Sequence, residues 1–323
     1  MHVMYTANKN FIEIMLTSIY SLILNGNLES INLHLITENC NEEDFNKIHN
    51  FLDQFENVNV DIYKLEENPI NEYGIPNWKD SQIANARLFY PRIIKERHPE
   101  IKNLLYIDCD TIIKKDLNGI TLYDNFPINA VLDEGKKDYH EKELGLDKYY
   151  NSGVLYMNVE QWNNLDMEYR IKDFCSKAKI KFTYPDQDVF NVTLKNEINT
   201  IPNRFNLSLF PSIFNKLGLK IYYDIQNRQI NYQDILEEKE KAIILHSLGL
   251  FNIKPWYDNK INPLTKEFTQ YVKDINPNFE LKELSRLKKI MTISPTLFKS
   301  IILIKPYIPT VIADKARVLS NKS

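Results

Sequence analysis

The first 65 residues alternate between short apolar runs and helical spacing, and this alternation restricts the fold more than any other feature of the chain. Apolar runs of strand length cover residues 3–7, 31–37 and 58–65. Between them, apolar residues recur at every third or fourth position over 11–23 and 41–55, which is the period of an α-helix. A strand–helix–strand–helix–strand order predicts a parallel sheet with helices on its faces.

The alternation continues along most of the chain. Further strands are predicted over 104–107, 128–134, 154–158 and 242–247, and helices over 81–97, 168–179 and from 185 onward. The first two helices also carry end signals, because Asn41 is a candidate N-cap and Asn25-Gly26 a candidate stop. The pattern weakens near residue 260. We therefore predict an α/β domain over residues 1–260 and a basic, apolar extension over 261–323.

Polar side chains stand where the predicted strands end. In open α/β sheets, ligands bind beyond the carboxyl ends of the strands, so these side chains are candidates for a binding site. They are Asn8, Asn10, Asp108, Asp110, Asp133, Asn151 and His246.

The segment "LLYIDCDTI" gives the most specific chemical signal, because two carboxylates directly follow a strand that reads as buried. Asp108 and Asp110 are two positions apart, so both can face one cation at the strand end. Carboxylate oxygens suit Mg²⁺ or Mn²⁺, and the His246 imidazole would complete a Mn²⁺ site better than a Mg²⁺ site. Lys254 follows eight residues after His246 and could neutralise a metal-bound diphosphate.

Each of these motifs also has a simpler structural interpretation. The two acids could form a solvated turn, and "NSG" at 151–153 could be an ordinary turn before a strand. Asp186, after Pro185, could serve only as a helix N-cap. Arg87 could cover a helix flank with its aliphatic stem.

Two other classes of protein fit parts of the sequence. "DCDTI" also matches a phosphatase of the haloacid-dehalogenase type, in which the first Asp is phosphorylated. That motif generally ends an early strand, whereas three predicted strands precede it here. A non-catalytic sugar-binding or scaffold protein is the third interpretation.

The composition of the chain restricts both its binding partners and its cellular compartment. The formal net charge of −3 does not favour nucleic acid. Three widely spaced cysteines give no disulfide framework and suggest a reducing compartment. The first residues lack the features of a signal peptide, and no run of 18 apolar residues occurs, so we expect a cytoplasmic protein.

The order of the motifs is more specific than any one of them. The chain resembles glycosyltransferase family eight, the retaining nucleotide-sugar transferases that include glycogenins and bacterial lipopolysaccharide galactosyl- and glucosyltransferases. The resemblance spans roughly residues 3–257 and rests on "MYTANKNF", "NARL", "LLYIDCDTIIKKDL", "YYNSGVLYMN", "PDQDVFN" and "HSLGLFNIKPW".

The resemblance implies a GT-A fold and a Mn²⁺-dependent transfer of a hexose from a UDP-sugar to a glycan, glycoprotein or glycolipid, with retention of configuration. It also implies residue roles. The metal ligands would be Asp108, Asp110 and His246, and the diphosphate would meet Gly249 and Lys254. The uridine would face Thr6, Asn8 and Asn10, with Ala7 and Cys109 also in the donor site. The donor sugar would face Arg87, Asn151, Asp186 and Gln187, and the acceptor hydroxyl would meet Asp133.

Retention of configuration raises the question of a nucleophile. A double displacement needs a carboxylate on the far face of the sugar carbon, but Gln187 stands at the matching position and an amide is a poor nucleophile. We therefore expect the acceptor to attack from the same face as the leaving group. Asp188 is the alternative nucleophile.

Residues 281–323 carry a net charge of +7 and mix lysines with apolar residues. This segment could form a small subdomain with a solvated basic face. It could equally lie on an anionic membrane surface, and the basic, apolar tails of bacterial family members favour this second interpretation. The enzyme would then be peripheral on the inner face of the membrane. A homo-oligomer is left open.

Overall fold

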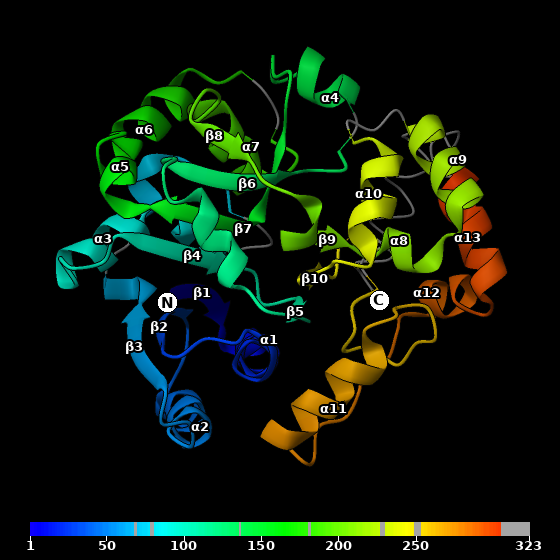
Figure 1. Ribbon diagram of the computed structural model, residues 1–323, viewed down its shortest axis with the longest axis horizontal. Coiled ribbons are helices and arrows are strands. Elements are labelled where there is room, and N and C mark those ends of the chain that lie inside the picture. The colour runs from blue at the N-terminus through cyan, green and yellow to red at the C-terminus, as the bar shows by residue number, and fades with distance from the viewer. Residues whose placement is uncertain are drawn as a thin grey trace.

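The computed structural model describes residues 1–67, 70–77, 81–135, 137–179, 182–226, 230–248 and 253–304. Its centre is a seven-stranded sheet with the order β3-β2-β1-β4-β7-β6-β8 (Figure 1). The strands are β1 His2–Asn8, β2 Ile31–Glu38, β3 Val58–Lys64, β4 Asn103–Ile107, β6 Ile128–Leu132, β7 Tyr150–Asn158 and β8 Ile198–Thr200.

This sheet is mixed and mainly parallel, which confirms the predicted fold class. β1 pairs in parallel with both β2 and β4, β2 with β3, and β6 with β8. Only β7 runs against its neighbours, β4 and β6. The carboxyl ends of β1 and β4 therefore lie at the same edge, where the predicted site residues follow.

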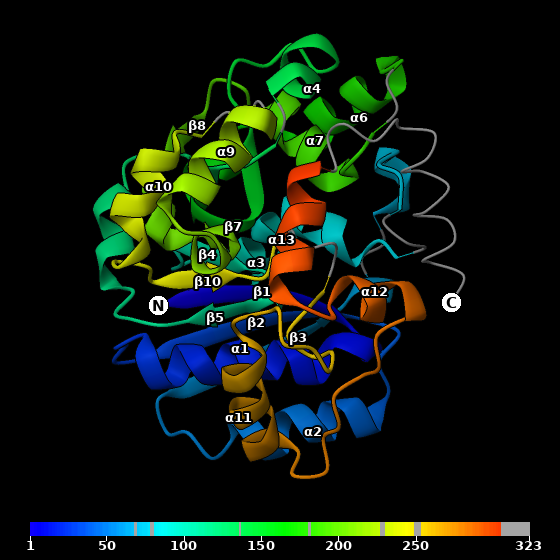
Figure 2. The ribbon, with the colours of Figure 1, turned by 90° about the vertical axis from the view of Figure 1, so that its right-hand side faces the viewer.

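Helices cover both faces of the sheet (Figure 2). α1 and α2 pack on one face, and α3, α5, α6 and α7 on the other. The helices are α1 Ile12–Asn25, α2 Glu42–Leu52, α3 Tyr90–Arg97, α4 Lys137–Lys142, α5 Val159–Asn163, α6 Met167–Lys177, α7 Pro185–Thr193, α8 Phe210–Ile213, α9 Lys216–Gln226, α10 Tyr232–Lys239, α11 Thr265–Ile275, α12 Arg286–Met291 and α13 Pro295–Ile304. None of the helices in the described ranges is long and apolar enough to cross a membrane.

β1 shows how the sequence produces two cores. Val3 and Tyr5 point to the face covered by α1 and α2, whereas Met4 between them points to the opposite face. All three are fully buried. Side chains alternate along a strand, so a stretch buried on both sides is expected to be apolar at every position, as β1 is over residues 3–5.

A small second sheet brings distant segments to the site. Its order is β5-β10-β9, with β5 at Thr111–Ile113, β10 at Ile244–His246 and β9 at Leu207–Ser208. β10 pairs antiparallel with β5, which follows directly after the two acids (Figure 1). This pairing places the end of β10 beside Asp110.

The segments after residue 260 pack on the rest of the chain. α11 lies against α1, where Phe268 and Val272 bury Ile14 together with Trp256. α13 packs on α9, and Phe298 joins the core formed by α8, α9 and α10. The division of the chain at residue 260 stays a prediction, because these contacts neither separate nor define two domains.

Local signals at helix ends are confirmed for the first two helices. Asn41 caps α2, and its side chain accepts a hydrogen bond from the Asp44 amide at 3.1 Å while Asp44 accepts one from the Asn41 amide. α1 ends at Asn25, with Gly26 as its C-cap.

Two local interpretations are wrong. Residues 151–153 are not a turn, because they lie inside β7, where Asp108 N–H donates to the Gly153 carbonyl at 2.7 Å. Asp186 is not the N-cap of α7, because Tyr184 holds that position and Pro185 begins the helix. Side chains from distant segments outweighed the turn propensity of the Asn-Ser-Gly sequence, because Gln187 and Arg87 bind the Ser152 amide and carbonyl.

Candidate active site

Three predicted metal ligands converge beyond the end of β4. Asp108 and Asp110 lie in the connection between β4 and β5, and His246 is the last residue of β10. His246 Nε2 is 3.1 Å from Asp110 Oδ1 and 3.7 Å from Asp108 Oδ2. One ligand atom of each residue lies within 4.8 Å of the other two.

The space around this cluster fits a cation. A Cβ atom built on Gly153 would stand 2.3 Å from His246 Cε1 and 2.6 Å from Asp108 Oδ2, so glycine is needed for the acids and the imidazole to close together. Two carboxylates and one imidazole form a donor set that suits Mn²⁺, and Mg²⁺ less well.

A chain of amide side chains orients His246. Asn151 Nδ2 donates to Asp133 Oδ2 at 2.9 Å, so the Asn151 Oδ1 oxygen faces the Asn206 amide group, which donates to it at 2.7 Å. Asn206 Oδ1 then faces His246 Nδ1 at 2.8 Å. His246 Nδ1 thereby donates to Asn206, and Nε2 is the ring nitrogen that faces the two acids, as a metal ligand requires.

Lys254 forms an ion pair with Asp110. Its Nζ donates a hydrogen bond to Asp110 Oδ2 and another to the Ser247 carbonyl, at 2.6 Å. Burial would raise the pKa of Asp110, but the Lys254 ammonium and His246 outweigh burial and hold that pKa well below its usual range. Asp110 is therefore ionised throughout the physiological range of pH.

Arg87 forms ion pairs with two of the acids, Asp108 and Asp186. It is only 6% exposed, and its Nη2 lies 3.1 Å from Asp108 Oδ1 while its Nε lies 3.4 Å from Asp186 Oδ2. Its Nη1 donates to the Ser152 carbonyl at 2.8 Å. Burial lowers the pKa of Arg87, but Asp108, Tyr106 and Asp186 more than offset this effect and raise the pKa.

The start of α7 presents its polar residues to β7. Gln187 Oε1 accepts hydrogen bonds from Asn151 Nδ2 at 3.1 Å and from the Ser152 amide at 3.0 Å, and Gln187 Nε2 donates to Asp133 Oδ2 at 3.1 Å. Asp186 accepts from the Ser152 hydroxyl at 3.0 Å. Burial raises the pKa of Asp186, and Arg87 opposes this effect.

Asp188 points in another direction. It is fully buried and accepts four hydrogen bonds. The Tyr149 and Tyr139 hydroxyls donate at 2.5 and 2.8 Å, and the Thr183 and Tyr184 amides donate at 2.8 and 3.0 Å. The carboxylate therefore fixes the two backbone amides that directly precede α7, those of Thr183 and of the N-cap residue Tyr184.

The end of β1 borders the acids on their other side. Thr6 Oγ1 lies 3.2 Å from the Tyr106 hydroxyl, which donates to Asp108 Oδ1 at 2.5 Å. Cys109 Sγ lies 3.0 Å from the Thr6 carbonyl oxygen, next to the buried Ala7. Asn8 caps the short turn after β1 by accepting from the Asn10 amide at 3.1 Å. Gly249 lies outside the described residues.

Three members of this network escaped the sequence analysis. Tyr106 reads as one more apolar residue of β4, and Ser152 as part of a turn. Asn206 is 40 residues from His246 and 55 from Asn151, and its segment carries no motif. Only Tyr106, a polar aromatic two residues before Asp108, offered a signal.

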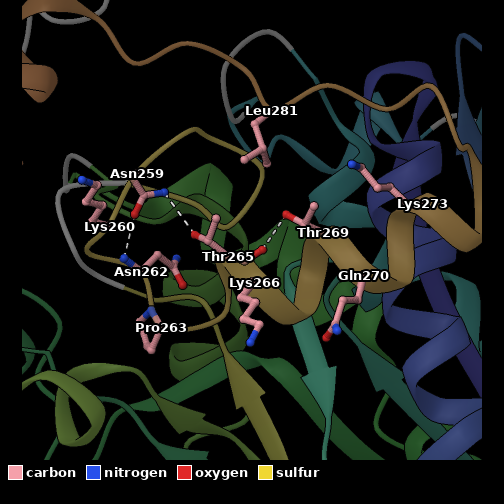
Figure 3. Close-up of a pocket in the computed structure, with 10 residues that line it drawn as sticks. All are labelled: Asn259, Lys260, Asn262, Pro263, Thr265, Lys266, Thr269, Gln270, Lys273 and Leu281. Carbon is pink, nitrogen blue, oxygen red and sulfur yellow. Dashed lines mark hydrogen bonds between the residues drawn. The ribbon is translucent and has the colours of Figure 1, made fainter.

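A separate pocket of about 580 Å³ lies beside α11 (Figure 3). Three lysines line it, Lys260, Lys266 and Lys273. Asn262 on its wall donates to the Ser247 hydroxyl at 3.1 Å and to the Ile253 carbonyl at 2.9 Å. The wall of this pocket therefore supports the segment that carries Lys254.

A mainly parallel sheet with an Asp-Asp-His cluster beyond its strand ends is the arrangement expected of a GT-A glycosyltransferase. The chain belongs to glycosyl transferase family 8, whose family model matches residues 2–260. This match replaces the phosphatase interpretation of "DCDTI".

Similar proteins agree with this assignment. A lipopolysaccharide 1,2-glucosyltransferase of Escherichia coli is 24% identical over 83% of this chain and 76% of its own length. General stress protein A of Bacillus subtilis is 24% identical over 84% of this chain and 93% of its own length. The solved structure of galactosyltransferase LgtC with donor and acceptor sugar analogs has a TM-score of 0.66 at 19% identity, and covers 85% of this chain and 96% of LgtC.

Proposed function

We propose that the chain transfers a hexose, glucose or galactose, from a UDP-sugar to a saccharide acceptor, with retention of the anomeric configuration. The observation that carries the proposal is the convergence of Asp108, Asp110 and His246 with the Lys254 ammonium beside them. Such a cluster suits a divalent cation and a diphosphate together, and nucleotide sugars carry their leaving group as a diphosphate.

Asp108, Asp110 and His246 would hold the cation, which we propose to be Mn²⁺ or Mg²⁺. When bound, it supplies a Lewis acid for the diphosphate oxygens. Lys254 would meet the same diphosphate as a donor of charge-assisted hydrogen bonds. We assign Gly249 to the diphosphate as well, from the sequence resemblance alone.

The remaining residues would arrange the donor. Thr6, Ala7, Asn8 and Asn10 border the uridine side, with Cys109 next to them. Gln187, Asn151 and Asp186 would meet the hexose. Arg87 has most of its donors occupied by protein oxygens, so we assign it to holding Asp108 and Asp186 in place.

Same-face attack fits these contacts better than a double displacement. The acceptor oxygen forms a bond to C1 as the bond from C1 to the phosphate oxygen breaks, and the leaving phosphate oxygen takes the acceptor's proton. Asp188 is the alternative nucleophile, but its two oxygens already accept four hydrogen bonds. Asp133 keeps its proposed contact with the acceptor hydroxyl, and the Gln187 amide would stabilise the positive charge developing on the sugar.

The acceptor is proposed to be a glycan, glycoprotein or glycolipid, and the lipopolysaccharide glucosyltransferase among the relatives favours a lipid-linked saccharide. A membrane-facing surface fits such an acceptor. On α12 and α13 and between them, Ile290, Ile293 and Leu297 are 57%, 74% and 41% exposed, and basic residues accompany them. We propose that this surface lies on an anionic membrane, on its cytoplasmic side. Residues 305–323 of the predicted tail lie outside the described residues.

Calorimetric binding of UDP, with and without Mn²⁺, tests the donor site. We expect binding that requires Mn²⁺ and that Asp110→Ala abolishes, whereas Asp53→Ala, at an exposed carboxylate after α2, leaves it unchanged. Binding that is independent of Mn²⁺ would contradict the metal assignment. UDP binding without transfer to any acceptor would favour the sugar-binding or scaffold alternative.

A screen of UDP-glucose and UDP-galactose then identifies the hexose, and the anomeric configuration of the product is read by NMR. Intact-protein mass spectrometry tests same-face attack. A glycosyl adduct on Asp188 or Gln187 would overturn it.

A further inference from the structure

Three of the six histidines gather far from the proposed donor site, where the parallel strands begin. His2 opens β1, His34 lies in β2 and His98 is the C-cap of α3. Asp61 of β3 stands beside His34 in the sheet, because the two residues are paired in register. The strands β1, β2 and β3, which carry His2, His34 and Asp61, lie side by side in Figure 1.

Three of these side chains direct ligand atoms at one another. Asp61 Oδ2 is 3.1 Å from His98 Nε2 and 3.8 Å from His34 Nδ1, and all three atoms lie within 4.8 Å. Around a tetrahedral zinc ion with bonds of about 2.0–2.1 Å, ligand atoms stand roughly 3.4 Å apart. The group therefore needs only small adjustments to enclose an ion.

Burial of the three side chains provides both an anchor and an entry path. The His34 side chain is fully buried, whereas those of His98 and Asp61 are 28% and 46% exposed. An ion arriving from solvent would meet the two outer ligands first and the buried nitrogen last. A water molecule can take the fourth position on the exposed side.

Neighbouring groups orient both imidazoles. His34 Nε2 lies 3.0 Å from His2 Nδ1, with the two rings stacked, and His98 Nδ1 lies 3.6 Å from Glu100 Oε1. Metal-binding histidines commonly have such partners at the second ring nitrogen. The Tyr63 hydroxyl lies 3.2 Å from His34 Nδ1 and would turn away from this nitrogen when an ion binds to it.

We propose that His34, Asp61 and His98 form a second metal site that takes a transition-metal ion such as Zn²⁺. Two imidazoles and one carboxylate favour zinc, whereas the oxygen-rich cluster of Asp108 and Asp110 favours Mn²⁺ or Mg²⁺. The ion would join β2, β3 and the end of α3. Its role is structural, and it is independent of the nucleotide-sugar site.

Zinc calorimetry on tag-free Asp110→Asn protein tests the site. This substitution weakens metal binding at the other cluster, Asp108, Asp110 and His246. We expect one Zn²⁺ per chain, a higher melting temperature with zinc, and an intense visible absorption of the Co²⁺ form, which indicates tetrahedral geometry. In the same background, His98→Gln and Asp61→Asn should each weaken zinc binding by at least about 10-fold. Both residues are partly exposed, and circular dichroism checks that each variant is folded.

His49→Gln is the matched control. His49 and Asp53 form a His–carboxylate pair at 3.8 Å on the surface of α2, and they belong to neither cluster of three ligands. This change should leave zinc affinity and melting temperature as they were. Absence of zinc binding, or equal affinity in His98→Gln, would overturn the proposal and leave His34, Asp61 and His98 as a hydrogen-bonded ion-pair group. Neither result depends on UDP binding.

Discussion

At the scale of single residues, His246 depends on a partner that carries no chemistry of its own. Asn206 joins His246 Nδ1 to Asn151 and is 5% exposed. Asn206→Ala should free the ring and leave its tautomer unassigned, which weakens Mn²⁺ binding by about 10–100-fold. Calorimetry with Mn²⁺ measures the effect.

Asn203→Ala provides the control, because Asn203 lies in the same short turn but outside the chain of side chains that reaches His246. Mn²⁺ affinity that is equal in Asn206→Ala and wild type would show that the imidazole needs no such orientation.

The thiols differ from ordinary cysteines. Burial, followed by Asp44 and Glu66, raises the pKa of Cys40 to about 11. Burial also raises the pKa of Cys175 and, with Asp108 and Asp110, that of Cys109. A raised pKa keeps the thiol protonated, so the reactive thiolate appears only as the pH rises toward the folded-state pKa.

Iodoacetamide at pH 8 should therefore alkylate Cys40 about 100-fold more slowly than a free thiol of pKa about 8.5, with a rate that still increases above pH 9. Peptide mass spectrometry follows the reaction at each cysteine. Urea-unfolded chain is the control and should react at the ordinary rate. Native protein that reacts as fast as unfolded protein would contradict the pKa of Cys40.

At the scale of elements, Asp188 holds the start of α7 against α4 and β7. Asp188→Asn replaces a buried carboxylate that accepts four hydrogen bonds with an amide that has one acceptor oxygen. We expect the free energy of unfolding to fall by about 3 kcal/mol, because charged hydrogen bonds are lost and buried donors stay unpaired. Urea denaturation measures it.

Asp173→Asn is the matched change on α6, where the ion pair with Lys177 is solvent-exposed and contributes little to stability. A different result would reassign Asp188: if Asp188→Asn kept wild-type stability but lost transfer activity, the carboxylate would belong to the chemistry and not to the helix.

The elements that could be predicted are those whose signal is local. The strands and helices up to residue 65 follow from periodicity, and Asn41 follows from capping. Residues 81–97 were predicted as helical, and the structure divides them into a 3₁₀ segment, Ile83–Leu88, and α3. The Asn-Ser-Gly stretch was misjudged because residues far along the chain hold its backbone, with the Ser152 amide donating to Gln187 and the Ser152 carbonyl accepting from Arg87, and no local rule contains those partners.

At the scale of the whole molecule, α12 and α13 form a basic surface beside exposed apolar residues. Replacing Lys288, Lys289 and Lys299 with Gln should weaken binding to anionic vesicles by about 100-fold, at about 1 kcal/mol per lysine, and leave the fold intact. Flotation with phosphatidylserine vesicles at low and moderate salt measures it.

The control replaces Lys172, Lys177 and Lys179 with Gln, which removes the same charge from exposed positions on and just after α6. Equal flotation of both triple variants and wild type would show that this surface is solvated and does not meet the membrane.

The arrangement of the site belongs to this scale too. Its residue types were readable, since Asp108, Asp110 and His246 each end or follow an apolar run. Their convergence depends on β10 pairing with β5, and the histidine group of β1–β3 depends on strand register. Neither of these long-range pairings can be predicted from a single sequence.

The pairing of β5 with β10 also has a consequence for biosynthesis. Asp110 and its partner His246 are 136 residues apart. A ribosome adding about 5–20 residues per second needs roughly 7–27 s to pass from one to the other. During that interval the early strands can already associate while the two acids lack both His246 and Lys254. A nascent chain stalled between them would therefore display an incomplete ligand set, and release of the last third of the polypeptide becomes the step that switches on cation binding.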